Sequence, residues 1–114
     1  MSNILKERNI RFYVKKFDGE NIKSVDTEDF DMQFIAGLYQ YLQIDEVISN
    51  IDLVLEGKYN QIDDPSITNK YDEYAYIQPD AIEYWDENHN KYDFTCSLQD
   101  FRELCIEWRN FLRG

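Results

Sequence analysis

The chain has few of the residues that build catalytic and metal sites. Its 114 residues include one histidine, two cysteines and two prolines, and its four glycines form neither Gly-x-Gly-x-x-Gly nor Gly-x-x-x-x-Gly-Lys. Those patterns place main-chain N–H groups around a phosphate, so no nucleotide-binding loop is predicted. One histidine and two separate cysteines are too few for a zinc site. We therefore predict no catalytic residue, no metal and no cofactor.

The remaining enzyme chemistries find little support. His89, the sole imidazole base, lies in "DENHNKY", which is typical of a turn between strands and predicts a solvated side chain. The acids of "DTEDFD" lack the glycine and the final glutamate of an EF-hand loop. Paired carboxylates could serve glycoside hydrolysis, but the short chain offers no evident sugar cleft. A small enzyme with a carboxylate site stays open only as an alternative.

Long apolar runs are also absent. No stretch approaches the roughly 20 apolar residues that cross a bilayer, and the start "MSNILKERN" has no apolar core of a signal peptide. Cys96 and Cys105 fall at the end of a predicted strand and inside a predicted helix, which is typical of buried free thiols in a reducing compartment. We expect a cytoplasmic protein without membrane contact.

Basic residues are scarce in one part of the chain. The formal net charge is −11, and residues 28–97 hold sixteen Asp and Glu against three Lys. Residues 1–27 are slightly basic, and residues 98–114 are balanced. A one-signed field of this kind attracts basic partners and repels nucleic acid and anionic membranes.

Size and hydrophobic periodicity predict one α+β domain over residues 1–114. Residues 10–25 alternate like a hairpin around Asp18–Gly19. A helical period then covers "DTEDFDMQFIAGLYQYLQ", with Asp26 or Thr27 as its cap and Glu28, Asp29 and Asp31 at its positive end. A second helix is predicted over "DEVISNIDLVLEG", with Asp45 as N-cap and Gly57 just past its end.

The second half of the chain is predicted to be mainly strands. "NQIDDPSITN" has the composition of a loop. Residues 71–78, 81–86 and 91–96 alternate like strands, and "SLQDFRELCIEWRNFL" is the clearest helix, with Ser97 as its cap. The predicted order is β-β-α-α-β-β-β-α with a mainly antiparallel sheet, because no regular β-α-β alternation occurs.

The segment "NKYDEYAYIQPDAIEYWDENHNKYDF" combines aromatic rings with carboxylates. A half-buried sheet explains many of these rings, since Tyr and Trp favour strands. It explains the charge less well, because a solvated face usually mixes both signs. Tyr and Trp dominate binding hot spots, and carboxylates accept paired hydrogen bonds from arginine. The segment therefore favours binding of a basic protein.

A short acidic α+β chain that is rich in Tyr and Trp and ends in "SLQDFRELCIEWRNFL" resembles the immunity proteins of bacterial toxin–immunity systems, above all those of contact-dependent growth inhibition. The resemblance implies a cytoplasmic protein that binds and neutralises one cognate toxin domain, often a nuclease. Because such families share little sequence, it carries no functional residue to this chain.

Charge and aromatic content supply the candidate residues. They lie in loops or beside turns, where core packing needs them least: Asp63, Asp64, Tyr71, Asp72, Glu73, Asp86 and Glu87, with Trp85 as a further anchor. Two other binding roles stay open. A nucleic-acid mimic would space its carboxylates regularly, and a subunit of a permanent complex would expose a large apolar area.

Overall fold

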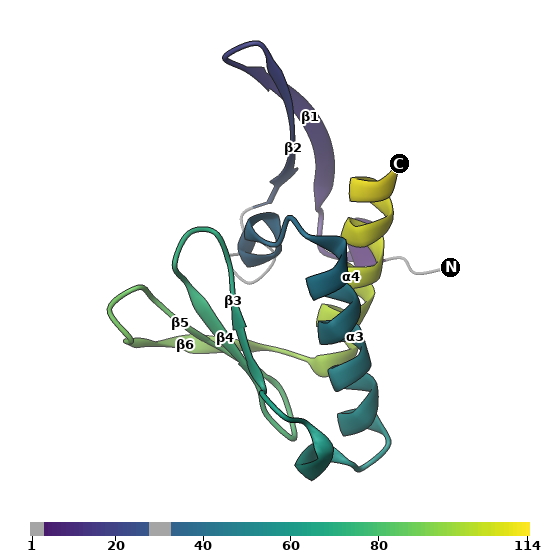
Figure 1. Ribbon diagram of the computed structural model, residues 1–114, viewed down its shortest axis with the longest axis vertical. Coiled ribbons are helices and arrows are strands. Elements are labelled where there is room, and N and C mark those ends of the chain that lie inside the picture. The colour runs from purple at the N-terminus through teal and green to yellow at the C-terminus, as the bar shows by residue number, and fades with distance from the viewer. Residues whose placement is uncertain (1–3, 28–32) are drawn as a thin grey trace.

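The N-terminal hairpin forms as predicted and projects from the rest of the molecule (Figure 1). The structure, a computed structural model, describes residues 4–27 and 33–114. Strands β1 (Arg11–Phe17) and β2 (Glu20–Asp26) pair antiparallel. Asp18 and Gly19 have φ values of 54° and 83°, which are the left-handed angles that a two-residue type I′ turn requires.

The first predicted helix is wrong at its C-terminal end. The chain forms a 3₁₀ turn, η1 (Ile35–Gly37), and then extends, with Leu38 at ψ 102°. Two tertiary bonds hold this break: the indole N–H of Trp108 donates to the Leu38 carbonyl at 2.7 Å, and the Lys70 N–H donates to the Gly37 carbonyl at 3.0 Å. Carbonyls bound elsewhere cannot continue a helix, so tertiary contacts override the local period.

The start of that predicted helix lies partly outside the described residues. Glu28, Asp29 and Asp31 belong to the segment that the structure does not describe. Asp26 is no helix cap, because it is the last residue of β2 and binds Arg11 at 3.2 Å. Thr27 accepts a bond from the Gln33 side chain through its carbonyl, at 2.6 Å.

The second predicted helix is confirmed, but it begins earlier than predicted. Helix α3 runs over Tyr41–Leu55, with Gln40 as its N-cap and Gly57, at φ 80°, just past its end. Asp45 therefore lies one turn inside the helix. Its carboxylate binds Arg109 of helix α4 (Leu98–Arg113) at 2.6 Å, so it joins two helices and does not cap one.

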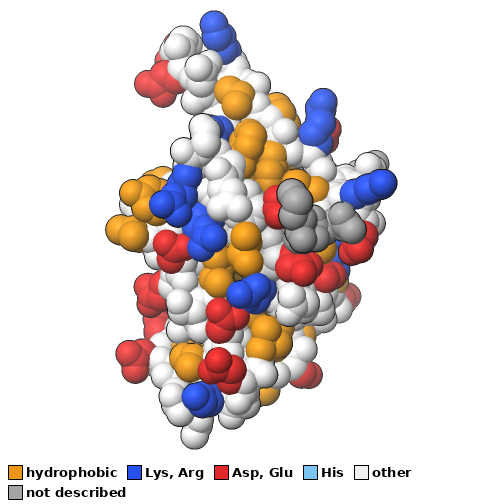
Figure 2. All heavy atoms as spheres, turned by 90° about the vertical axis from the view of Figure 1, so that its right-hand side faces the viewer, with side chains coloured by type: hydrophobic (Ala, Val, Ile, Leu, Met, Phe, Trp, Pro, Cys, Tyr) orange, Lys and Arg blue, Asp and Glu red, His pale blue; other side chains and the backbone are white. Residues whose placement is uncertain are grey.

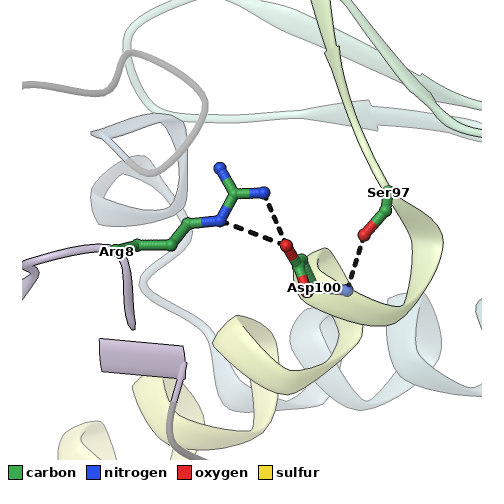
Figure 3. A network of polar contacts seen from close by, with 3 residues as sticks. All are labelled: Arg8, Ser97 and Asp100. Atoms are coloured by element: carbon green, nitrogen blue, oxygen red, sulfur yellow. Dashed lines mark hydrogen bonds and ion pairs between the residues drawn. The ribbon is translucent and has the colours of Figure 1, made fainter. Parts of the chain in front are cut away.

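Helix α4 begins at the predicted cap. The Ser97 hydroxyl accepts the Asp100 N–H at 3.1 Å, which satisfies one of the free donors of the first turn. The Asp100 carboxylate does not return to the Ser97 backbone as in a full capping box. It instead accepts two bonds from Arg8, at 3.2 and 2.5 Å, next to the short helix α1 (Ile4–Glu7), which was not predicted (Figure 3).

Four strands form the second sheet, in the order β3-β4-β5-β6, and all neighbours are antiparallel. They are β3 (Ser66–Thr68), β4 (Tyr74–Ile77), β5 (Ile82–Trp85) and β6 (Lys91–Cys96). The loop predicted over residues 60–69 is wrong, because it holds β3 and part of the 3₁₀ turn η2 (Tyr59–Gln61). Ile67 gives β3 one buried side chain, too little for a visible period.

The core lies between this sheet and helices α3 and α4, which cover one face of it (Figure 1). Trp108, Tyr84, Phe34 and Phe101 are its largest buried side chains. Both cysteines are buried free thiols, as predicted. The α+β class, the mainly antiparallel pairing and the predicted order of elements are confirmed. Within the described ranges, no helix is long and apolar enough to cross a membrane.

Candidate partner-binding site

The turn between β3 and β4 is built around the side chain of Asn69, which is 8% exposed. Its Oδ1 accepts the N–H groups of Tyr71 and Glu73, at 3.0 and 3.1 Å. Its Nδ2 donates to the Phe34 carbonyl at 3.2 Å and to Glu73 Oε1 at 3.0 Å. An amide that uses both ends in this way fixes the turn to the core and leaves Tyr71 52% exposed.

The turn between β5 and β6 is built around Asp86. Its Oδ1 accepts the N–H groups of Asn88 and Asn90, at 2.8 and 2.9 Å. These bonds, first of all the one from the Asn90 backbone, lower the pKa of Asp86 below its ordinary value. His89 reaches φ 61° in this turn, and its ring stacks on Tyr74 at 4.5 Å between centroids. Asp86 is therefore a turn-forming residue as well as a surface charge.

Antiparallel pairing brings the two turns to the same end of the sheet. Tyr74 pairs with Thr68 of β3 and with Trp85 of β5. The chain therefore leaves β3 and β5 at one end of the sheet and enters β4 and β6 at the same end. Between the turns lies a pocket of about 240 Å³. It is lined by Tyr71, Glu73, Asp86, Glu87 and Tyr92, which we name the acidic aromatic pocket.

The electrostatics of this pocket favour a cation. Burial raises the pKa of Tyr92, and the negative charges of Glu73, Asp86 and Glu87 raise it further, because they oppose a second negative charge on the ring oxygen. Three carboxylates and two phenol rings therefore face one small volume. A guanidinium or ammonium group placed there would gain charge-assisted hydrogen bonds and contact with ring faces.

The structure does not bring all eight predicted site residues together. Tyr71, Glu73, Asp86 and Glu87 line the pocket, and Asp72 is exposed in the same turn at φ 61°. The other three lie elsewhere: Asp63, Asp64 and Trp85.

Asp63 and Asp64 lie at the opposite end of the sheet. Asp64 Oδ1 accepts both the N–H and the hydroxyl of Ser66, at 2.9 and 2.7 Å, and these bonds, the hydroxyl's first, lower its pKa. Ser66 pairs with Tyr76, and Ile77 donates to the Pro65 carbonyl, so this acid pair lies near the turn from β4 to β5. The sequence placed Asp63 and Asp64 in a loop beside the predicted strands, but it did not show at which end of the sheet that loop lies.

Trp85 lies on the sheet face that α3 and α4 leave uncovered. It is half-buried, and Tyr76 packs edge-on against it at 6.0 Å. Its Nε1 is shielded from solvent and has no hydrogen-bond partner among the described residues. Trp85 thus packs against the sheet near the pocket without lining it, whereas the ring of Tyr92 lines the pocket. Tyr92 was missed, because its alternation with Phe94 and Cys96 predicted a core ring.

Some acids outside the pocket form ion pairs with basic side chains of the same chain. On helix α3, Asp52 binds Arg102 of α4 at 2.6 Å, and Asp45 binds Arg109. The helical side of the molecule shows Asp and Glu interspersed with Lys and Arg (Figure 2). Pairs of this kind need no partner molecule to balance them, so the acidic surplus of residues 28–97 is not one continuous surface.

His89 does not line the acidic aromatic pocket. Among the described residues, no group of three or more His, Cys, Asp or Glu could hold a metal ion. Comparison with known proteins adds no family: no protein-family model, no curated protein and no solved structure matches the chain.

Proposed function

We propose that the protein is a stoichiometric inhibitor that binds a basic protein through the acidic aromatic pocket, and that it acts as an immunity protein against a cationic toxin domain. The observation that carries this proposal is the meeting of three carboxylates and two tyrosines from two separate turns and strand β6. A surface that serves only for solubility needs no such convergence.

The turns hold these groups in place before a partner arrives. Asn69 and Asp86 bond to the main chain of their own turns. A pre-ordered site loses less entropy on binding than a mobile loop does. Tyr71, half-exposed, and Tyr92 offer large rings with few rotatable bonds, which suits an arginine or lysine of the partner.

A nuclease is the favoured target class. Its active site is basic because it binds phosphate, and an acidic protein can occupy that groove in place of nucleic acid. The net charge of −11 would also speed capture, since long-range attraction raises association rates about 10- to 10³-fold at low salt. Speed matters when the target damages the cell.

Growth protection tests the proposal. The toxin to test would be a basic C-terminal domain of a large secreted protein, if one is encoded directly upstream. Its induction should stop growth, and co-expression of this chain should restore it. The double variant Asp72→Asn with Glu87→Gln removes two charges beside the pocket and keeps side-chain shape, so we expect weaker protection when expression is low.

A matched control separates the site from net charge. Asp63→Asn with Asp80→Asn removes the same charge from the opposite end of the sheet, where both acids are exposed. This control should protect as the natural chain does. Equal loss in both double variants, or none in either, would contradict the site. His89→Ala should leave protection intact, whereas complete loss would favour the enzyme alternative.

A further inference from the structure

The hairpin offers an unpaired strand edge on its β2 side. A two-residue turn closes on a hydrogen-bonded pair, here Phe17–Glu20, and hydrogen-bonded and non-hydrogen-bonded pairs alternate along an antiparallel ladder. Lys16–Asn21 and Val14–Lys23 are therefore non-hydrogen-bonded pairs. Asn21 and Lys23 direct their N–H and C=O groups away from β1, toward the free edge.

That edge forms one wall of a groove. The groove has a volume of about 700 Å³, and four consecutive residues of β2, residues 20–23, line it. Side chains of consecutive residues point to opposite faces of a strand. Because all four residues line the groove, the main-chain edge of β2 must border it. In Figure 1, β2 is the strand of the hairpin that faces the turn between β3 and β4.

The body of the protein forms the rest of the groove. Ala36 and Leu112 contribute apolar surface above the buried Trp108, and Tyr39, which is 60% exposed, lies at the border of the groove with Lys70. A neighbouring pocket of about 380 Å³ shares Tyr39 and Lys70, so the groove continues toward β3.

The described residues that line the groove carry a positive charge on balance. Lys70 forms no ion pair among the described residues, and its ammonium lies 5.4 Å from the centroid of the Tyr71 ring. Lys23 donates to the carbonyls of Phe111 and Leu112, at 2.7 and 3.0 Å, which leaves it one N–H and its charge. Glu20 is the only acid among the described residues that line the groove.

We propose that this groove binds an extended segment of a partner polypeptide that adds a strand to β2, with apolar side chains over Ala36 and Leu112 and an acidic side chain toward Lys70. The strand edge supplies main-chain hydrogen bonds, the floor buries apolar area, and the lysine selects charge. An isolated two-stranded hairpin is only marginally stable in water, so a third strand would also stabilise the projecting arm.

A single strand fits this groove better than a second copy of the chain does. A second hairpin would have to enter between β2 and the wall that Tyr39 and Lys70 form. Pairing of two β2 edges would also bring the Lys23 side chains of both copies near each other, which costs free energy. The inference is independent of the proposed function, because it concerns another surface and an occupant of opposite charge.

A peptide titration tests the groove. The probe is a short blocked peptide in which valine and glutamate alternate, and its counterpart carries lysine in place of glutamate. In ¹⁵N-resolved NMR spectra of the full chain, we expect the glutamate peptide to shift the amide signals of residues 20–23 and the indole signal of Trp108. The lysine peptide should bind at least tenfold more weakly.

Two proline variants make the test specific to one edge. Asn21→Pro removes an outward N–H of β2 and should weaken peptide binding at least tenfold. Lys16→Pro makes the same change in the same pair on the opposite edge and should bind like the natural chain. Lys70→Ala should weaken binding of the glutamate peptide, whereas Lys58→Ala, an exposed lysine outside the groove, should not.

Several outcomes would overturn the inference. They are the absence of shifts at residues 20–23 at millimolar peptide, equal binding by Asn21→Pro and the natural chain, and equal weakening by both proline variants. Shifts of the same signals on concentrating the chain without peptide would assign the edge to a second copy instead. If both peptides bind equally, the acidic preference is wrong.

Discussion

The sheet end that carries the acidic aromatic pocket and the tip of the projecting hairpin hold their exposed turns in place in different ways. At the sheet end, Asn69 and Asp86 bond to the main chain of their turns, and Asn69 also reaches the core carbonyl of Phe34. The hairpin has no such side chain at its tip. It depends on its turn angles and on contacts near its base.

The difference shows where each region gains its stability. Phe12 packs edge-on against Trp108 at 5.0 Å and in a tilted arrangement against Phe111 at 5.4 Å, so rings hold the base of the hairpin to α4. Beyond it, Val14 and Phe17 are 51% and 68% exposed. The sheet end is fixed and negatively charged. The outer half of the hairpin lacks packing partners among the described residues of its own chain. Fixed groups suit recognition, and a free edge suits strand addition.

The largest expected effect comes from Trp108→Ala, which removes the ring that joins the hairpin to the core. The change opens a cavity in the core and leaves the Leu38 carbonyl without its donor, so the free energy of unfolding should fall by about 3–5 kcal/mol. Urea denaturation measures it. Trp85→Phe, at the half-buried indole of the uncovered sheet face, is the control and should cost about 1 kcal/mol. Equal losses would mean that the hairpin and the body are not joined through Trp108.

A smaller and more local effect is expected from Gly37→Ala. A Cβ at this position would lie 2.6 Å from Cβ, Cγ and Nδ2 of Asn69. Asn69 must then move, and the loss should be about 1–3 kcal/mol, with faster amide exchange at Tyr71 and Glu73 than in the natural chain. Amides of the hairpin should keep their exchange rates.

Gly57→Ala serves as the control for this change. Its added Cβ meets no atom within 4 Å, but the residue has φ 80°, so only backbone strain of about 1 kcal/mol is expected. Amide exchange at Tyr71 and Glu73 should not respond. If both glycine variants loosen that turn equally, the close approach of Gly37 to Asn69 does not hold it.

Acid should loosen the sheet end before the hairpin. The pKa of Asp86 is lower in the folded protein than in the unfolded chain, where it is about 3.9. Its contribution is therefore fully present above about pH 4 and is lost as the pH falls toward the folded pKa. Asp86→Ala should flatten the decline of stability below pH 4 in denaturation series. Asp80→Ala, which removes a charge but no hydrogen bond to a turn, should leave the decline unchanged.

The smallest effect is expected at the tip of the hairpin. Phe17→Ser replaces a ring that is 68% exposed, and the free energy of unfolding should change by no more than about 0.5 kcal/mol. A loss above 1 kcal/mol in urea denaturation would show that the tip packs against its own chain. The arm would then not be free for a partner.

Much of the fold could be predicted because local signals agreed with tertiary structure. Asp18–Gly19 set the hairpin register, and Ser97 marked the start of α4. The break after Gly37 was missed, because it depends on carbonyl contacts with Lys70 and Trp108, which lie far along the chain. Asp45 was misread for the same reason, since its partner Arg109 is on another helix.

The candidate site was predictable in composition but not in geometry. Charge and aromatic content pointed to the segment that contains the acidic aromatic pocket, and four of the predicted residues line that pocket. Which end of the sheet Asp63 and Asp64 occupy follows from strand pairing, which the sequence did not specify. Asn69 was overlooked, since the environment that gives a buried amide its role comes from Phe34 and Gly37, more than thirty residues earlier.

Association kinetics test the central claim most directly. The rate constant for binding the basic toxin domain is measured by stopped flow at low and at physiological salt for two double variants, Asp72→Asn with Glu87→Gln and Asp63→Asn with Asp80→Asn. If the acidic aromatic pocket attracts the partner, the first pair slows association at least about threefold at low salt and less at higher salt, while the second pair changes it little. Equal rates for the two pairs at both salt concentrations would contradict the account.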